Sequence, residues 1–130
     1  MTTASTEMRE LPTLRIRAIN SASESAGSIH DDAKAREMGY RGGLVPGVTI
    51  MGYMSRLMYE NFSTDWTEGG SFHGLLRRPV YEGDEVTVEG IASAPDADGR
   101  IGVEINVIDP EGNVCARANA TCRAGSEGRS

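Results

Sequence analysis

The sequence contains few of the residues that metal centres and disulfide frameworks need. Its 130 residues include 2 cysteines and 2 histidines, and no Cys-x-x-Cys pair occurs, so the ligand spacing of a structural zinc site is missing. Cys115 and Cys122 lie in one expected strand, where their odd separation would put them on opposite faces. We therefore expect no bound metal and two free thiols, which suit a reducing compartment.

Long apolar runs and an excess of positive charge are also absent. No stretch approaches the roughly 18 consecutive apolar residues that a membrane-spanning helix requires. The formal net charge is −6, which disfavours a nucleic-acid or anionic-membrane partner. The opening segment MTTASTEMREL has no basic region followed by an apolar one, so we expect no secretion signal and a cytoplasmic location.

The motifs of several enzyme classes do not occur either. There is no Gly-x-Gly-x-x-Gly motif after a strand and no P-loop, so nucleotide binding through those motifs is unsupported and we expect no cofactor. A Gly-x-Ser-x-Gly elbow, which would mark a serine hydrolase, is also missing. With 38% hydrophobic residues the chain is typical of one globular domain, expected at 12–124 between flexible segments at 1–11 and 125–130.

One stretch of the chain predicts a long apolar helix. Pro46 and Gly47 begin it, and proline fits the first turn because its missing N–H would have had no partner there. Apolar side chains then recur at helical spacing over one broad arc: Ile50, Met51, Met54, Leu57, Met58 and Phe62. Such a helix must be largely enclosed by other elements.

Alternating segments on both sides of this helix predict the strands that enclose it. One strand is expected at 13–19, and four more are expected at 71–80, 85–92, 100–108 and 114–123, with hairpin turns between them. A short helix is expected from about Ala33 to Gly39, and 63–70 is expected to be a loop. The sequence therefore predicts an α+β fold in which a curved antiparallel sheet wraps around one long apolar helix.

This order of elements resembles the hotdog fold, and two motifs resemble its MaoC-like group. The motifs are IHDD at 29–32 and GGLVPG at 42–47, and RPVYEGDEV at 78–86 is similar to that group's strand–turn–strand segment. The resemblance covers roughly 13–123. It implies a hydratase or dehydratase, like the (R)-specific enoyl-CoA hydratases, that acts on an acyl thioester of coenzyme A or a carrier protein. It also implies a homodimer.

The resemblance assigns roles to individual residues. In (R)-hydratases the loop before the helix reads Asp-x-Asn-Pro-x-His, and His30 matches its histidine. Ser25 stands at the aspartate position, so Glu24 is the candidate replacement carboxylate. Gly47 matches the glycine whose backbone N–H polarises the thioester carbonyl. Val45, Tyr53 and His73, together with Ser25, are candidate substrate contacts.

The same chemistry follows from the residues themselves. Adding or removing water next to a thioester needs hydrogen-bond donors for the enolate oxygen, which a helix N-terminus supplies. It also needs a group that exchanges protons near neutral pH, for which His30 is suited. Glu24 or Asp31 could orient the imidazole.

Plainer interpretations stay open beside these roles. His30 could simply cap the short helix, Glu24 could be a solvated loop residue, and His73 could be a paired residue of the sheet. Arg77 and Arg78 are adjacent in a strand and are therefore expected to face opposite ways, so one of them could meet a cofactor phosphate, with a solvated charge as the plainer interpretation. At the level of function, the pocket could instead serve cyclisation, conjugate addition or isomerisation, or the chain could bind a thioester or small ligand without catalysis.

Overall fold

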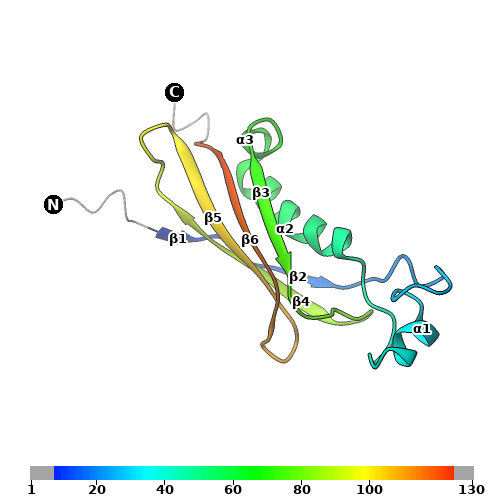
Figure 1. The fold of residues 1–130 in the computed structure, drawn as a ribbon. Helices are drawn as coiled ribbons and strands as arrows, with labels where there is room; N and C mark the ends of the chain where they lie inside the picture. Colours follow the sequence, from blue (N-terminus) through cyan, green and yellow to red (C-terminus); the bar gives the residue numbers. More distant parts are fainter. Residues whose placement is uncertain (1–7, 125–130) are drawn as a thin grey trace.

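An antiparallel sheet curves around the helix α2 (Gly47–Phe62) in the computed structural model, which describes residues 8–124 (Figure 1). Hydrogen bonding arranges the strands in the order β1-β4-β5-β6-β3, and β2 also pairs with β4. The strands are β1 (Met8–Glu10), β2 (Leu14–Arg17), β3 (Ser71–Leu76), β4 (Glu85–Ser93), β5 (Arg100–Ile108) and β6 (Val114–Arg123). The predicted α+β arrangement is confirmed.

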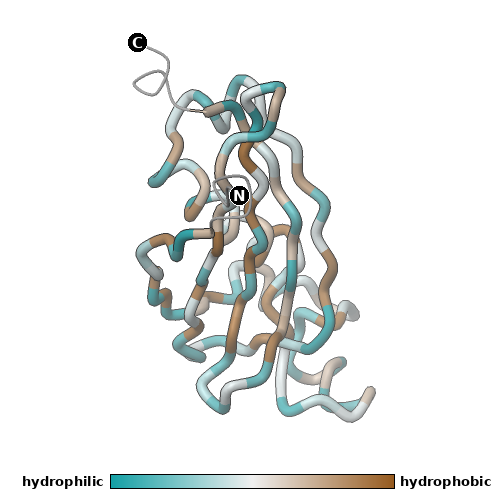
Figure 2. The backbone as a smooth tube through the Cα atoms, turned by 90° about the vertical axis from the view of Figure 1, so that its left-hand side faces the viewer, coloured by the Kyte–Doolittle hydropathy of each residue, from teal (hydrophilic) through white to brown (hydrophobic). Residues whose placement is uncertain are grey.

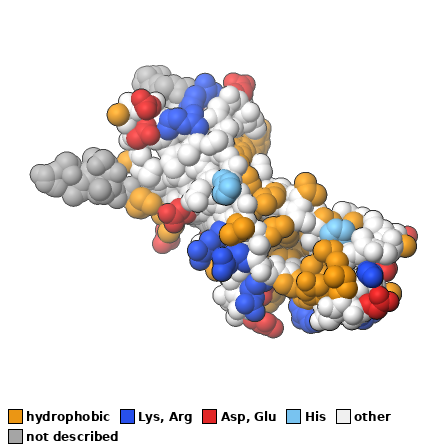
Figure 3. Space-filling view, viewed as in Figure 1, with side chains coloured by type: hydrophobic (Ala, Val, Ile, Leu, Met, Phe, Trp, Pro, Cys, Tyr) orange, Lys and Arg blue, Asp and Glu red, His pale blue; other side chains and the backbone are white. Residues whose placement is uncertain are grey.

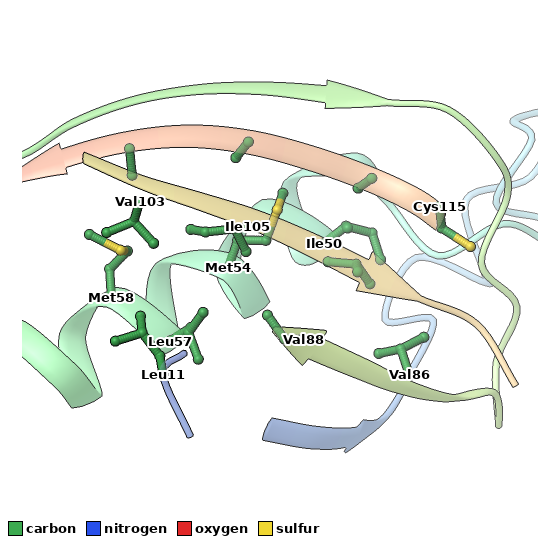
Figure 4. Close-up of a cluster of buried hydrophobic side chains, with 14 of the residues drawn as sticks. Leu11, Ile50, Met54, Leu57, Met58, Val86, Val88, Val103, Ile105 and Cys115 are labelled. Atoms are coloured by element: carbon green, nitrogen blue, oxygen red, sulfur yellow. The ribbon is translucent and has the colours of Figure 1, made fainter. Parts of the chain in front are cut away.

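The core lies between α2 and the concave face of the sheet (Figure 4). The predicted arc of α2 supplies Ile50, Met54, Leu57, Met58 and Phe62, all buried, with Met51 partly buried. The facing strands contribute inward side chains at every second position, among them Val86, Val88, Val103 and Ile105. Each such side chain contributes about 1.5–3 kcal/mol on burial, so this interface holds the helix in place. Figure 2 shows hydrophobic and hydrophilic residues interleaved along the strands.

The enclosure of α2 is incomplete within one chain. Val48 and Tyr59 lie away from the sheet, with exposed fractions of 79% and 53%. At the edge of the sheet, Leu75 and Leu76 of β3 are 54% and 47% exposed, and Leu76 lies against Gly47 at the start of the helix. One side of the helix and the neighbouring strand edge therefore remain open to solvent.

The prediction that the two cysteines face opposite sides of their strand is wrong. Both thiols are free and both belong to the buried core cluster. The reason is an irregularity in β6: Val107 pairs with Ala116, but Ile108 pairs with Val114, so Cys115 is an extra residue between paired positions. A bulge of this kind interrupts the alternation of side chains.

Two short helices follow local sequence signals of different strength. The predicted helix near Ala33 is α1 (Asp32–Glu37), and the Asp31 carboxylate caps it by accepting a hydrogen bond from the Lys34 N–H at 3.1 Å. By contrast, α3 (Thr64–Thr67) lies in the stretch predicted to be a loop. A single turn leaves no repeating pattern in the sequence, so periodicity could not indicate it.

The start of the described chain also differs from expectation. Met8–Glu10, within the segment expected to be flexible, pairs with residues 91–93 of β4 although all three residues are exposed. The pairing is made by backbone groups, so a pattern of alternating apolar and polar side chains could not predict it. Leu11, also within that segment, is buried in the core, and residues 1–7 and 125–130 lie outside the described residues. Of the helices within 8–124, none has the length and hydropathy to cross a membrane.

Candidate active site

The loop that carries His30 is held by a buried asparagine. Asn20 is 6% exposed, and its side-chain amide donates to the backbone oxygen of His30 at 2.8 Å. Its backbone N–H donates to Glu82 Oε1 at 2.9 Å, and its side-chain oxygen accepts from the Ala22 N–H at 3.1 Å. Asn20 thereby ties the histidine loop to the turn before β4.

A second segment approaches the same loop through a glycine. The Leu44 N–H donates to the Ile29 oxygen at 2.9 Å, which places 43–44 directly against 29–30. A Cβ at Gly43 would collide with the backbone oxygen of His30, so no other residue fits without moving the chain. The Gly43 N–H is satisfied by Asp32 Oδ1 at 2.7 Å.

These contacts fix the imidazole of His30 in one orientation. Its Nδ1 lies 2.8 Å from the backbone oxygen of Leu44. Because a carbonyl oxygen only accepts, the proton of the neutral ring is on Nδ1, and Nε2 is left with a free lone pair. The half-buried side chain therefore presents a proton acceptor at Nε2.

The first turn of α2 lies beside this imidazole. Pro46 precedes the helix and provides no side-chain cap. The N–H groups of Thr49 and Ile50 donate to the Pro46 oxygen at 3.0 and 3.3 Å, whereas those of Gly47 and Val48 come earlier and have no acceptor within the helix. They point outward at the positive end of the helix dipole, which favours a negatively charged oxygen.

His30 and the helix start line one cavity of about 220 Å³. The volume is below that of a typical site for a drug-sized ligand, so the cavity suits a small group or one end of a longer molecule. Most of its wall is apolar, and Figure 3 shows an apolar patch on this face of the molecule. The lining residues are Ile29, His30, Tyr40, Leu44, Val45, Gly47, Ile50, Leu76, Arg77, Arg78, Pro79 and Val80.

Three of the residues predicted for the site come together in this cavity, namely His30, Val45 and Gly47. Val45 is buried and its N–H donates to the Val80 oxygen at 2.8 Å, which holds the segment between β3 and β4 against the residues that precede α2. Tyr53 lies further along α2, where its hydroxyl is 3.4 Å from the Ile19 N–H. His73 is exposed on β3 and pairs in register with Asn119.

The predicted carboxylate partner does not reach the cavity. Glu24 and Ser25 occupy exposed turns, and neither lines the cavity wall. The Asp31 carboxylate is engaged in capping α1. Within residues 8–124 the wall contains no aspartate or glutamate, so His30 is its main candidate for proton transfer.

Sequence reasoning allowed at most one of two neighbouring arginines to meet the ligand. Arg77 and Arg78 were predicted to face opposite ways, yet both line this cavity. The backbone N–H groups of both donate to the same oxygen, that of Cys115, at 2.8 and 3.1 Å. Both residues follow the end of β3 (Ser71–Leu76), which is shorter than the predicted strand at 71–80, so the alternation on which the prediction relied does not reach them. The doubled arginine was visible in the sequence, but the early end of the strand was not.

The described residues contain no group of three His, Cys, Asp or Glu side chains placed to hold a metal ion. Comparison of the sequence found no matching family model and no matching curated protein.

The structure nevertheless matches solved structures along most of its length. An (R)-hydratase from A. caviae involved in PHA biosynthesis is 19% identical, with a TM-score of 0.71 over 89% of this chain and 94% of that one. The ChsH1-ChsH2 complex from Mycobacterium tuberculosis gives 24% identity and a TM-score of 0.69, over 88% and 94% of the two chains.

A MaoC-like dehydratase from Rhodospirillum rubrum is 18% identical with a TM-score of 0.64, and 91% of each chain is covered. At identities this low a likeness shows the fold and not the reaction. The expected fold is thereby confirmed, and the chain is a hotdog-fold protein.

Proposed function

We propose that this protein is a hydratase or dehydratase that acts on an acyl thioester. One observation carries the proposal: His30, with its free Nε2, and Gly47, whose N–H has no acceptor within α2, line one small, mostly apolar cavity. The structural likeness to an (R)-hydratase and a MaoC-like dehydratase supports the same reaction class. The acyl carrier is coenzyme A or a carrier protein.

The proposed dehydration begins when the thioester oxygen accepts a hydrogen bond from the Gly47 N–H. His30 Nε2 takes a proton from the carbon next to the carbonyl, and the negative charge moves to the oxygen, where the helix start stabilises it. The protonated imidazole then gives its proton to the leaving β-hydroxyl group, which departs as water. Hydration follows the same steps in reverse, with His30 removing a proton from water.

A second candidate follows from the composition of the cavity wall. His30 is present there, but within residues 8–124 no carboxylate accompanies it. A single base suffices to move a proton between two carbons of one enolate, so isomerisation is one alternative reaction type. Cyclisation and conjugate addition are further alternatives, because they use the same donors to stabilise an enolate. Glu24 remains a proposed partner of His30 that would have to come from its exposed turn, or from a second copy of the chain, to the cavity.

The test is turnover of a panel of 2-enoyl and 3-hydroxyacyl thioesters, with binding measured in parallel by calorimetry. We expect His30→Ala to lower kcat/KM by about 10²- to 10⁴-fold with little change in affinity, because general acid–base groups typically contribute that much. Tyr40→Phe, which changes a neighbouring wall residue without removing a base, is the matched control.

Glu24→Gln distinguishes a mechanism in which Glu24 and His30 share the proton from one in which His30 acts alone. If Glu24 shares the proton with His30, its substitution lowers the rate by a comparable factor, and the double variant is no worse than His30→Ala alone. If His30 acts by itself, Glu24→Gln leaves turnover unchanged. If a thioester binds tightly without turnover, and neither substitution changes its affinity, the proposed enzymatic activity is wrong and the protein is a non-catalytic binding protein.

A further inference from the structure

The segment that follows β3 gives the cavity two positive charges at neighbouring positions. Arg77 and Arg78 both line it, on the side of the wall formed by Leu76, Pro79 and Val80. Their backbone N–H groups both donate to the Cys115 oxygen, so the backbone that carries the two side chains is held in place. Figure 3 shows basic side chains gathered over the lower ends of β3 and β6, next to the apolar patch.

Arg77 and Arg78 do not form a salt bridge with any residue in 8–124. Arg41, for comparison, lies over the Tyr81 ring at 4.2 Å and 3.9 Å from Asp84 Oδ2. Two adjacent, exposed guanidinium groups repel each other unless an anion lies between them. The chain has a formal charge of −6 and therefore repels anions as a whole. The two arginines make this cavity a place where an anion is attracted instead.

We propose that Arg77 and Arg78 form a clamp for an anionic oxygen group on the ligand. Guanidinium groups bind carboxylates and phosphates through paired N–H···O bonds, and two of them can hold one such group from both sides. The proposal rests on the proposed function in one respect: the ligand is taken to be the acyl thioester that His30 and Gly47 act on.

The anion has two chemical sources, a carboxylate on the acyl group or the phosphate of the carrier arm. The cavity holds about 220 Å³ and contains both the histidine and the arginines, so the clamped group lies within a few bonds of the reacting carbons. This favours the carboxylate, because the phosphate of a pantetheine arm is separated from its sulfur by a long chain of atoms.

The first experiment tests the clamp without any turnover. The probes are glutarate and inorganic phosphate, titrated into the protein while the arginine side-chain N–H signals are followed by NMR. We expect saturable shifts of two signals, both absent in the double variant Arg77→Gln/Arg78→Gln, with affinity at least roughly 10-fold weaker in each single variant. Arg15→Gln, on the exposed face of β2, is the charge-matched control and is expected to bind like the wild type.

The second experiment identifies the source of the anion. Neutral and carboxylate-ended acyl groups of equal length are compared as N-acetylcysteamine thioesters, and the neutral acyl group is compared again as its 4′-phosphopantetheine thioester. A preference for the acidic acyl group that disappears in the double variant assigns the clamp to a carboxylate. A preference for the phosphopantetheine form that disappears there assigns it to phosphate.

Failure of the clamp and failure of the proposed reaction give different results. If no thioester is turned over but the anion titration still depends on Arg77 and Arg78, the clamp stands and the reaction is wrong. If thioesters are turned over with the same preferences in wild type and double variant, and neither probe binds, the clamp is overturned and the reaction stands.

Discussion

Gly47 is the residue at which catalysis and packing can be separated most cleanly. A Cβ added there would meet Cδ1 of Leu76, the end of a flexible side chain that is 47% exposed. The neighbour can therefore move or be shortened, and the helix start itself does not have to shift. The position tolerates a methyl group as far as the fold is concerned, so any loss of activity reports on the approach of the substrate.

We expect Gly47→Ala/Leu76→Ala to lower kcat/KM at least about 10-fold relative to Leu76→Ala alone, because the new methyl group crowds the carbonyl away from its donor. Unfolding temperatures of the two variants should agree within a few degrees. Equal kcat/KM values in the two proteins would remove Gly47 from the proposed mechanism.

Cys115 gives a prediction on stability. Burial, together with the nearby Asp109 carboxylate, raises the pKa of its thiol from 9.0 to about 11. Between pH 9 and 11 the unfolded chain ionises this thiol while the folded chain keeps it protonated, so the folded state loses stability as the pH rises. The contribution is fully present below pH 9, and the loss reaches at most roughly 3 kcal/mol.

The measurement is the free energy of unfolding in urea at pH 8 and pH 10.5 for wild type and Cys115→Ala. The wild type should lose more stability over this interval than the variant, which has no thiol at 115. Parallel losses would show that other titrating groups account for the whole dependence. Iodoacetamide should also modify native Cys115 far more slowly than the urea-unfolded chain.

His30, Val45 and Gly47 could be found in the sequence because their signals are local. A histidine before a short helix and a glycine after a proline indicate a loop and a helix start, and these adjoin in the fold. Arg77 and Arg78 could not be placed in the same way, since their orientation depends on hydrogen bonds to Cys115, far along the chain.

At the scale of elements, α2 contains one residue that makes the folded protein less stable than alanine would at the same position. Gly52 lies inside the helix, is exposed, and has nothing within 4 Å of an added Cβ. Glycine in a helix interior costs roughly 0.5–1 kcal/mol relative to alanine because the unfolded chain is freer.

Gly52→Ala should therefore raise the free energy of unfolding by about 0.5–1 kcal/mol, measured by urea denaturation, with turnover unchanged. Gly70→Ala is the opposite control, since its Cβ would come within 2.5 Å of the backbone oxygen of Trp66 and should destabilise the protein. A destabilising Gly52→Ala would mean that another molecule covers this stripe of the helix in solution.

The elements that sequence patterns predicted are those with repeating burial. In β4 and β5 every second residue is buried, and α2 buries one face over 16 residues, so period and length both indicate the type of element. The elements that could not be predicted, α3 and β1, are 4 and 3 residues long, too short for either signal.

At the scale of the whole molecule, β3 is the end strand of the sheet, and no strand within residues 8–124 pairs with its outer edge. Exposed Leu75 and Leu76 lie on it, and exposed Val48 lies on the adjoining helix. A free edge with apolar side chains is a surface that another strand can cover. We propose that a second copy of the chain pairs with it, giving a homodimer.

Light scattering should accordingly give twice the mass of one chain at micromolar concentration. Leu75→Lys should weaken the dimer at least about 10-fold, because pairing two copies brings like charges together across the edge. Ile91→Lys makes the same change on β4, at a residue of similar exposure (41%) inside the sheet, and should leave the mass unchanged. A wild-type monomer would remove this interface.

The charge of the cavity depends on where β3 ends. Side chains of a strand alternate between the two faces of a sheet, and β3 ends at Leu76, directly before the two arginines of the cavity wall. If the strand ran on through both arginines, one guanidinium would turn to the far face of the sheet, and the cavity would lose half of its arginine charge without any change in residue type. The end of a strand, and not only the residues near it, thus sets how strongly this cavity attracts an anion.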